Sequence, residues 1–246
     1  MKFNFKEKLK KLFKFLYPQD VKCVFCGEEI KVPNQYICEN CLKKLPYNNG
    51  QICKLCGVQI NSLADICESC FSQFPNFKIA RAPFVYTGKI RLAINRFKFD
   101  NAKYFIEPLG RFLIDEYDKN NYNCELIIPV PLSPNRLKSR RYNQAELLAK
   151  PLSVAKNIPI RTDIAKRIKN TFSQANLKSF ERRENLKNAF EIIDKKAIKN
   201  KNILVIDDVI TTGETVKSLC KEINKCHPKS ISILTLAHTV LKEKKS

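Results

Sequence analysis

The sequence predicts an α/β fold with a parallel sheet flanked by helices, preceded by a small cysteine-rich module. Four Cys-x-x-Cys pairs crowd into residues 23–70, and no further pair of this kind follows. Beyond residue 77, short apolar runs typical of buried parallel strands alternate with helical patterns. One such run, residues 203–206, leads through two aspartates into a Thr/Gly loop that opens a helix. We therefore expect a metal-binding module joined to a ligand-binding α/β domain.

Composition sets the broad class. The 246 residues are 44% hydrophobic, enough for one domain of ordinary size plus a small module. Because there is no apolar run of about 18 residues and no secretory signal pattern, we expect a cytoplasmic protein without stable membrane insertion. Lys and Arg number 45 against 24 Asp and Glu, a net charge of +21, which favours a phosphate-rich partner. The alternative is a source organism whose proteins are all rich in lysine.

Residues 1–20 predict a basic amphipathic helix. Apolar residues fall on one helical face and lysines surround it; the apolar set is Phe5, Leu9, Leu12, Phe13 and Leu16. Such a helix fits docking onto the adjacent module, with contact to a membrane surface or an acidic partner as the alternative.

Residues 21–75 predict a double zinc ribbon. The pairs form an internal duplication, in which Gly27 and Gly57 follow the second cysteine of each copy and permit the positive φ of a knuckle. Four thiolates per ion leave no open position, so two structural zinc sites are expected. Neighbour pairing is favoured over a cross-braced arrangement because each copy holds a complete ligand set. The ligands are Cys23, Cys26, Cys38 and Cys41 for one ion, and Cys53, Cys56, Cys67 and Cys70 for the other.

Residues 80–246 predict the larger domain, with the boundary near residues 72–80. We expect a strand at 82–86, helices at 89–96 and 104–117, a buried strand at 126–131, and a helix from about residue 143 that Pro151 kinks or divides. Arginines crowd residues 136–144 beside the buried strand's end. Their guanidinium groups would hold a pyrophosphate or backbone phosphates, and an inert solvated loop is the alternative.

The run from Asn202 to Cys220 carries the most specific signal. Asp207 and Asp208 are acceptors suited to the vicinal hydroxyls of a sugar, and they would stabilise positive charge at its anomeric carbon. Residues 211–215 offer main-chain N–H groups and hydroxyls to a phosphate at a helix N-terminus. The alternative is an ordinary βαβ crossover with capping threonines.

This run resembles the 5-phosphoribosyl-1-diphosphate (PRPP) binding loop of type I phosphoribosyltransferases. Together with the preceding double zinc ribbon, several motifs in order resemble the ComF family over about residues 21–239. These motifs are Pro129-Val130-Pro131, Arg141-Tyr142-Asn143-Gln144, Thr171 with Gln174, Leu177, Arg182 and Asn185, Ala189-Phe190, and Asp207 to Thr215.

The resemblance implies a type I phosphoribosyltransferase fold and a role in natural transformation. The implied ligands are PRPP as substrate with Mg²⁺, and the implied partners are incoming single-stranded DNA, the competence helicase and the recombination mediator. Asp207 and Asp208 would be catalytic. The remaining implied site residues are Thr211, Thr212, Gly213, Glu214 and Thr215 at the 5-phosphate, Arg140, Arg141 and Asn143 near the pyrophosphate, and Gln174, Arg182 and Asn185 in a covering loop.

The chain departs from the family pattern at three positions. Arg141 stands where members usually place glycine, Tyr142 where they often place phenylalanine, and Glu214 adds a negative charge to the phosphate loop.

Three functions compete at this stage. The first is a competence protein that handles single-stranded DNA and keeps a PRPP/Mg-type pocket, whether or not it catalyses transfer. The second is an active phosphoribosyltransferase acting on a nucleobase or other small acceptor. The third is a zinc-ribbon adaptor with a relict catalytic domain. For DNA, basic residues near positions 89–98 and 136–141 would contact phosphates, with Phe97, Phe99, Tyr142 and Phe172 available for stacking.

Overall fold

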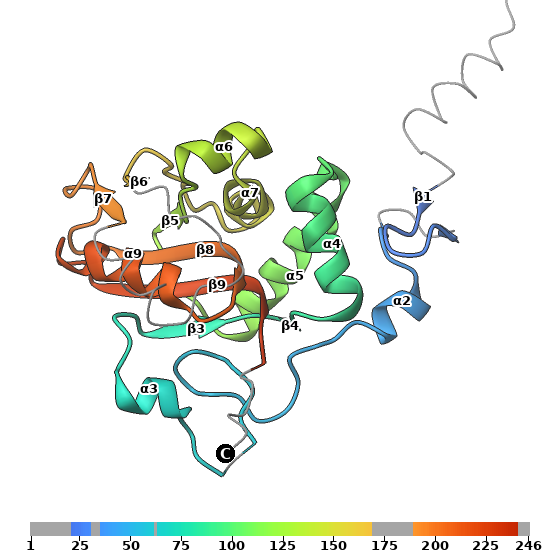
Figure 1. Ribbon diagram of the computed structural model, residues 1–246, viewed down its shortest axis with the longest axis horizontal. Helices are drawn as coiled ribbons and strands as arrows, with labels where there is room; N and C mark the ends of the chain where they lie inside the picture. The colour runs from blue at the N-terminus through green and yellow to red at the C-terminus, as the bar shows by residue number, and fades with distance from the viewer. Residues whose placement is uncertain (1–20, 31–34, 62, 169–188, 241–246) are drawn as a thin grey trace, which may run out of the picture. The chain divides into compact units, whose positions relative to one another are not determined.

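The computed structural model describes residues 21–30, 35–61, 63–168 and 189–240 (Figure 1). The chain divides into two compact units, residues 1–45 and 46–246. The N-terminal helix expected at residues 1–20 lies outside the described residues, as do Gln174, Arg182 and Asn185. The domain ranges expected from the sequence therefore stay a prediction.

The first unit holds one cysteine-rich knuckle. Strands β1 (Val21–Lys22) and β2 (Glu29–Ile30) pair antiparallel, and the short helix α2 (Glu39–Lys43) follows. The turn between the strands closes where the Gly27 amide donates to the Cys23 carbonyl at 2.8 Å. Gly27 takes a φ of +78°, which a residue without Cβ adopts at low cost.

The second unit is built on a parallel sheet (Figure 1). Its strand order is β3-β9-β8-β5, and β4 also pairs with β9. The strands are β3 (Ile79–Arg81), β4 (Phe84–Val85), β5 (Leu126–Pro129), β8 (Asn202–Ile210) and β9 (Ser230–His238). Because all pairs are parallel, the carboxyl ends of β5, β8 and β9 meet at the same edge of the sheet.

Helices cover both faces of this sheet. Helix α9 (Glu214–Asn224) buries Val216, Leu219 and Ile223 in one cluster with Ile203 and Val205 of β8. The alternate β8 residues point to the other face, where α5 (Ile106–Lys119) and α7 (Gln144–Lys156) pack together and contact β8 and β9. This burial on both faces explains why the central strands are apolar throughout.

Shorter elements complete the second unit. They are α3 (Glu68–Ser72), α4 (Gly88–Phe99), the 3₁₀ turn η1 (Lys103–Phe105), α6 (Pro134–Arg140) and the antiparallel pair β6 (Ala165–Arg167) and β7 (Phe190–Ile192). Among the described residues, no helix has both the length and the apolar character needed to span a membrane.

The structure corrects several predicted boundaries. The strand expected at 82–86 is only β4, over residues 84–85, and a second strand, β3, precedes that range; both pair with β9. The helix expected at 89–96 runs over 88–99, and the one expected at 104–117 is a 3₁₀ turn followed by a helix over 106–119. Strand β5 ends at Pro129, although the apolar run continues to Pro131. Of the two outcomes expected at Pro151, division of the helix was wrong, because α7 continues through it, and a kink stays a prediction.

The second cysteine repeat packs against the sheet of its own unit. The Ala80 amide of β3 donates to the Leu55 carbonyl at 2.7 Å, and the Asn48 side chain donates to the Gly57 carbonyl at 2.9 Å. A Cβ at Gly57 would lie 2.6 Å from the Ala80 carbonyl oxygen. This approach is closer than any residue with a side chain would tolerate, so Gly57 fits the repeat onto β3.

Candidate functional site

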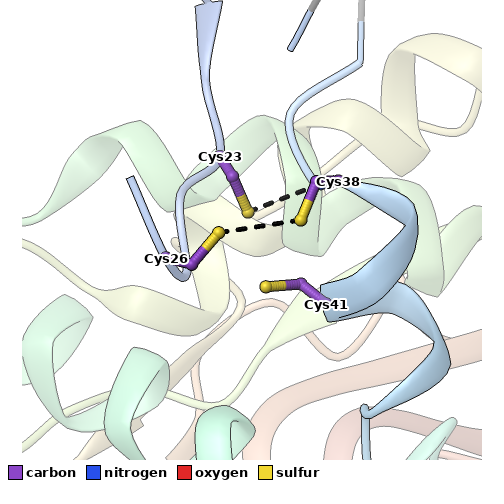
Figure 2. Close-up of side chains that lie close together, drawn as sticks. All are labelled: Cys23, Cys26, Cys38 and Cys41. Carbon is purple, nitrogen blue, oxygen red and sulfur yellow. Dashed lines mark hydrogen bonds between the residues drawn. The ribbon is translucent and has the colours of Figure 1, made fainter. Parts of the chain in front are cut away.

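The first four-cysteine group gathers the thiols of Cys23, Cys26, Cys38 and Cys41 within 4.8 Å of one another (Figure 2). Cys23 and Cys26 come from the β1–β2 knuckle, while Cys38 caps α2 and Cys41 lies in its first turns. The Sγ atoms of Cys26 and Cys38 are 3.6 Å apart, and the Cys38 amide points at Cys23 Sγ from 3.4 Å.

The second group repeats this arrangement with Cys53, Cys56, Cys67 and Cys70. The Sγ atoms of Cys56 and Cys67 are again 3.6 Å apart, and the amides of Cys56 and Cys67 lie 3.5 and 3.3 Å from Cys53 Sγ. Four sulfurs around a tetrahedral Zn²⁺ at about 2.3 Å would sit about 3.8 Å from each other. Both groups fit closed zinc sites, and each is drawn from one sequence repeat.

Asp207 and Asp208 lie inside strand β8, not after it. The strand runs on to Ile210 because Asp207, Val209 and Ile210 stay paired with residues of β9 between Thr235 and His238. Asp207 Oδ1 accepts from the Asp208 amide at 2.9 Å. The pKa of Asp207 is raised to about 7, mainly by burial and then by the negative charge of Asp208, while the cations Lys98 and Arg167 oppose the rise.

The loop after β8 is short and leads directly into α9. Gly213 caps the helix with a φ of +77°, and Glu214 is the first helical residue. The amides of the first helical turn have no acceptor within the helix, and the dipole leaves that end partly positive. An anion at this end would accept from several main-chain donors at once.

A polar pocket opens at the carboxyl edge of the sheet, between the aspartates and the cations of three other elements. Its cationic side chains are Lys98 of α4, Arg136 and Arg140 of α6, and Arg167 of β6. The complete lining is Tyr86, Lys98, Val130, Pro131, Leu132, Arg136, Arg140, Arg167, Asp207, Asp208, Val209, Thr211 and Thr215. The pocket thus joins two carboxylates, four cations and two threonine hydroxyls, a set of hydrogen-bonding groups suited to a phosphorylated sugar.

Two of the four cations of the pocket, Lys98 and Arg140, are held in place by polar contacts within the protein. Lys98 Nζ lies 2.7 Å from Asp208 Oδ1, with side chains only 16% and 11% exposed. Arg140 Nη1 donates at 3.1 Å to Oε1 of the buried Gln144. Burial lowers the pKa of Arg167 to about 10, with repulsion from Arg136 adding to the effect. Lys98 and Arg140 are therefore positioned before any ligand arrives, which reduces the entropic cost of binding.

Several predicted site residues lie away from this lining. Arg141 ends α6 with a φ of +65° and is exposed. Asn143 caps α7, since its Oδ1 accepts from the Ala145 amide at 3.1 Å and its Nδ2 donates to the Val130 carbonyl at 3.0 Å. Thr212 and Gly213 line a second cavity beside the second cysteine group. Their assignments to ligand, and that of Glu214, stay predictions.

Sequence reasoning missed the roles of Lys98 and Arg167 at the pocket. Lys98 ends an amphipathic helix, where a lysine is usually solvated, and Arg167 lies in a short strand far along the chain. No local pattern marks Arg167 as buried, because Lys166 precedes it and Ile168 follows it.

Comparisons with known proteins agree with this architecture. The double zinc ribbon domain matches residues 12–71, and the phosphoribosyl transferase domain matches residues 153–246. Competence protein F of Haemophilus influenzae is 33% identical over 225 residues, which are 88% of this chain and 96% of that protein. Competence protein ComFC of Bacillus subtilis is 27% identical over 75% of this chain and 76% of its own length. DNA utilization protein YhgH of Escherichia coli O157:H7 is 26% identical over 89% of this chain and 97% of its own length.

Proposed function

Because this chain belongs to the ComF family of competence proteins, we propose that it handles incoming single-stranded DNA in natural transformation and binds PRPP with Mg²⁺ in its polar pocket. The single observation that carries the pocket proposal is the meeting of Asp207 and Asp208 with four cations at the edge of a parallel sheet. The competence helicase and the recombination mediator are the proposed protein partners.

The charges of the pocket match the groups of PRPP. Asp207 and Asp208 would accept from the ribose hydroxyls and stabilise positive charge at the anomeric carbon. The guanidinium groups of Arg136, Arg140 and Arg167 would hold pyrophosphate oxygens. The first turn of α9, with the Thr211 and Thr215 hydroxyls, would hold the 5-phosphate. Mg²⁺ would neutralise charge on the pyrophosphate.

Calorimetry tests the pocket. Mg²⁺-PRPP is titrated into the wild-type protein, into Asp207→Asn/Asp208→Asn, and into Asp163→Asn. Asp163 is a matched control because its carboxylate is exposed and pairs with Arg161 at 2.7 Å, outside the pocket. We expect the double variant to bind at least about tenfold more weakly, since two charge-assisted hydrogen-bond acceptors are lost, and the control to match wild type. Equal heats from all three proteins would dismiss the pocket.

Salt dependence tests the DNA proposal. With a net charge of +21, binding to an oligonucleotide should weaken as salt rises, by about 0.7 log units per log unit of salt for each phosphate neutralised. Fluorescence anisotropy with a labelled single strand measures this slope. Absent binding, or an affinity indifferent to salt, would remove the DNA role.

Catalysed phosphoribosyl transfer is the second candidate, and the same pocket favours it. Pyrophosphate release from PRPP, measured with free bases and with DNA, separates the two functions. Release that depends on a free base would make the protein a salvage-type enzyme. Mg²⁺-PRPP binding with no release would favour a binding role.

A further inference from the structure

We propose that single-stranded DNA binds across one surface of the second unit, with bases stacked on Phe99 and Tyr104; this inference rests on the proposed DNA-handling function. The surface, here called the aromatic face, consists of the end of α4, the turn η1, the end of α6 and Tyr142 just after it. Its residues are Arg96, Phe99, Lys103, Tyr104, Arg140 and Tyr142.

Two aromatic rings of this face are exposed where the fold does not require it. Phe99 is 69% exposed and Tyr104 is 50% exposed. On α4 the last buried residue is Phe97, and Phe99 lies about 200° further around the helix axis. The Phe99 side chain therefore points away from the core. Large exposed rings are costly in water, and they serve well as platforms for unpaired bases.

Cationic side chains lie next to the aromatic rings of this face. The guanidinium carbon of Arg140 lies 5.2 Å from the centre of the Phe99 ring, and that of Arg96 lies 5.9 Å from the Tyr104 ring. Lys103 Nζ lies 5.2 Å from the Tyr142 ring. Asp100, next to Phe99, adds a negative charge, but three cations outweigh it. Rings alternating with cations match a strand whose bases alternate with phosphates.

The face continues into the polar pocket. Arg140 lines the pocket and also covers Phe99, so a strand stacked on Phe99 would pass the pocket mouth. Two residues suggested for DNA by sequence are not available on this face. Phe97 is fully buried, and Lys98 is occupied by Asp208.

The charge and the rings together select the partner. A duplex offers phosphates but hides its bases, so it would gain little from Phe99 and Tyr104. An acidic protein would use the cations without needing ring platforms. Single-stranded DNA uses both, and we commit to it.

The test measures binding of fluorescein-labelled oligo-dT of about 20 nucleotides to the full-length zinc-loaded protein. The variant is Phe99→Ala/Tyr104→Ala. The matched control is Phe71→Ala/Phe74→Ala, which removes two rings of the same unit that are 75% and 68% exposed. We expect the variant to bind about 10- to 100-fold more weakly, since stacking contributes this much per base or two, and the control to stay within about twofold of wild type.

A second variant, Arg96→Gln/Lys103→Gln, should lower the salt slope by about 1.4, because two phosphate contacts are lost. Unchanged melting temperature and unchanged Mg²⁺-PRPP heats show that each variant is folded. If wild type binds oligo-dT and Phe99→Ala/Tyr104→Ala binds it equally well, the proposal that DNA binds at the aromatic face is wrong, while the proposed DNA-handling function stands. A duplex that competes as well as oligo-dT would also overturn the proposal of binding at the aromatic face. If wild type does not bind oligo-dT at all, the proposed DNA function itself fails.

Discussion

At the scale of single residues, Asp207 couples the candidate site to stability. Burial and Asp208 raise its pKa from 3.8 to about 7. Between about pH 4 and pH 7 the folded state therefore keeps a proton that the unfolded chain has released. The free energy of unfolding consequently falls as the pH rises through this window, and the loss is complete above about pH 7.

Replacing Asp207 by Asn removes this cost. We expect Asp207→Asn to raise the free energy of unfolding by about 1–3 kcal/mol at pH 8, less than the full shift implies because nearby cations offset part of it. The gain should be smaller at pH 6 by up to about 1 kcal/mol. Urea unfolding at pH 6, 7 and 8 measures it, within the range where thiolates keep their zinc. A gain that does not vary with pH would contradict the assigned pKa.

Lys98 has the opposite effect at the neighbouring carboxylate. Because Lys98 and Asp208 are both largely buried, Lys98→Gln should lower the free energy of unfolding by about 1–3 kcal/mol by leaving a carboxylate without its cation. The double variant Lys98→Gln/Asp208→Asn should recover most of the loss, because an amide pair replaces the ion pair. Urea unfolding at pH 8 of the four proteins closes the cycle. Strictly additive losses would show that the ion pair contributes nothing.

At the scale of elements, the end of α6 carries a strained backbone. Arg141 closes the helix in the left-handed region with its amide bonded to the Leu137 carbonyl at 2.8 Å. Glycine adopts that conformation without a Cβ clash. The geometry of the helix end would thus favour a glycine at this position without any ligand contact.

Arg141→Gly should therefore stabilise the protein by about 1 kcal/mol. Asn157→Gly is the control, since Asn157 ends α7 with a φ of +52° and asparagine tolerates this region, so its gain should be a few tenths of that. Scanning calorimetry compares the two. A loss of stability in Arg141→Gly would mean that the arginine side chain makes a contact worth more than the strain.

The elements also show where sequence patterns succeed and where they stop. Apolar β-branched runs predicted the central strands because those strands are buried on both faces. The same pattern predicted that β8 ends at Ile206, because two adjacent carboxylates are seldom found inside a buried strand. The strand continues because residues 207–210 stay paired with β9. Likewise α7 continues through Pro151, whose ring packs against Gly110 of α5, a tertiary contact invisible in the helical pattern.

At the scale of the whole molecule, the candidate site was predictable only where it is local in sequence. The carboxylates and the loop hydroxyls lie within nine residues, so one motif reveals them. Lys98, Arg136 and Arg167 reach the same pocket from three separate elements, and no periodicity links them. The second cysteine repeat poses a similar problem, because its sequence does not indicate that it packs against the sheet.

The second cysteine repeat packs against the sheet, and it also lies close to residues 211–215, the loop proposed to hold the 5-phosphate. A cavity beside the loop is lined by Cys56 and Cys70 on one side and by Thr212 and Gly213 on the other, and Lys217 Nζ reaches Ser69 Oγ at 3.5 Å. The second ribbon therefore supports the loop that would hold the 5-phosphate. A change that disturbs the contact between the second ribbon and β3 should lower the stability of the second unit and weaken ligand binding.

The paired glycines of the two repeats test this support. Gly57 and Gly27 have similar positive φ values, +73° and +78°, but a Cβ at Gly57 would meet the Ala80 carbonyl at 2.6 Å, whereas a Cβ at Gly27 would meet nothing within 4 Å. Both alanine variants pay the same backbone cost, and only Gly57→Ala must push the ribbon away from β3.

We expect Gly57→Ala to lower the melting temperature of the second unit by several degrees and to weaken Mg²⁺-PRPP binding, while Gly27→Ala changes neither. The unfolding transition that Mg²⁺-PRPP raises identifies the second unit, because a ligand stabilises the unit that binds it. Calorimetry supplies both the transition and the affinity. An unchanged melting temperature of the second unit and an unchanged Mg²⁺-PRPP affinity in Gly57→Ala would mean that the contact between the second ribbon and β3 does not support the loop.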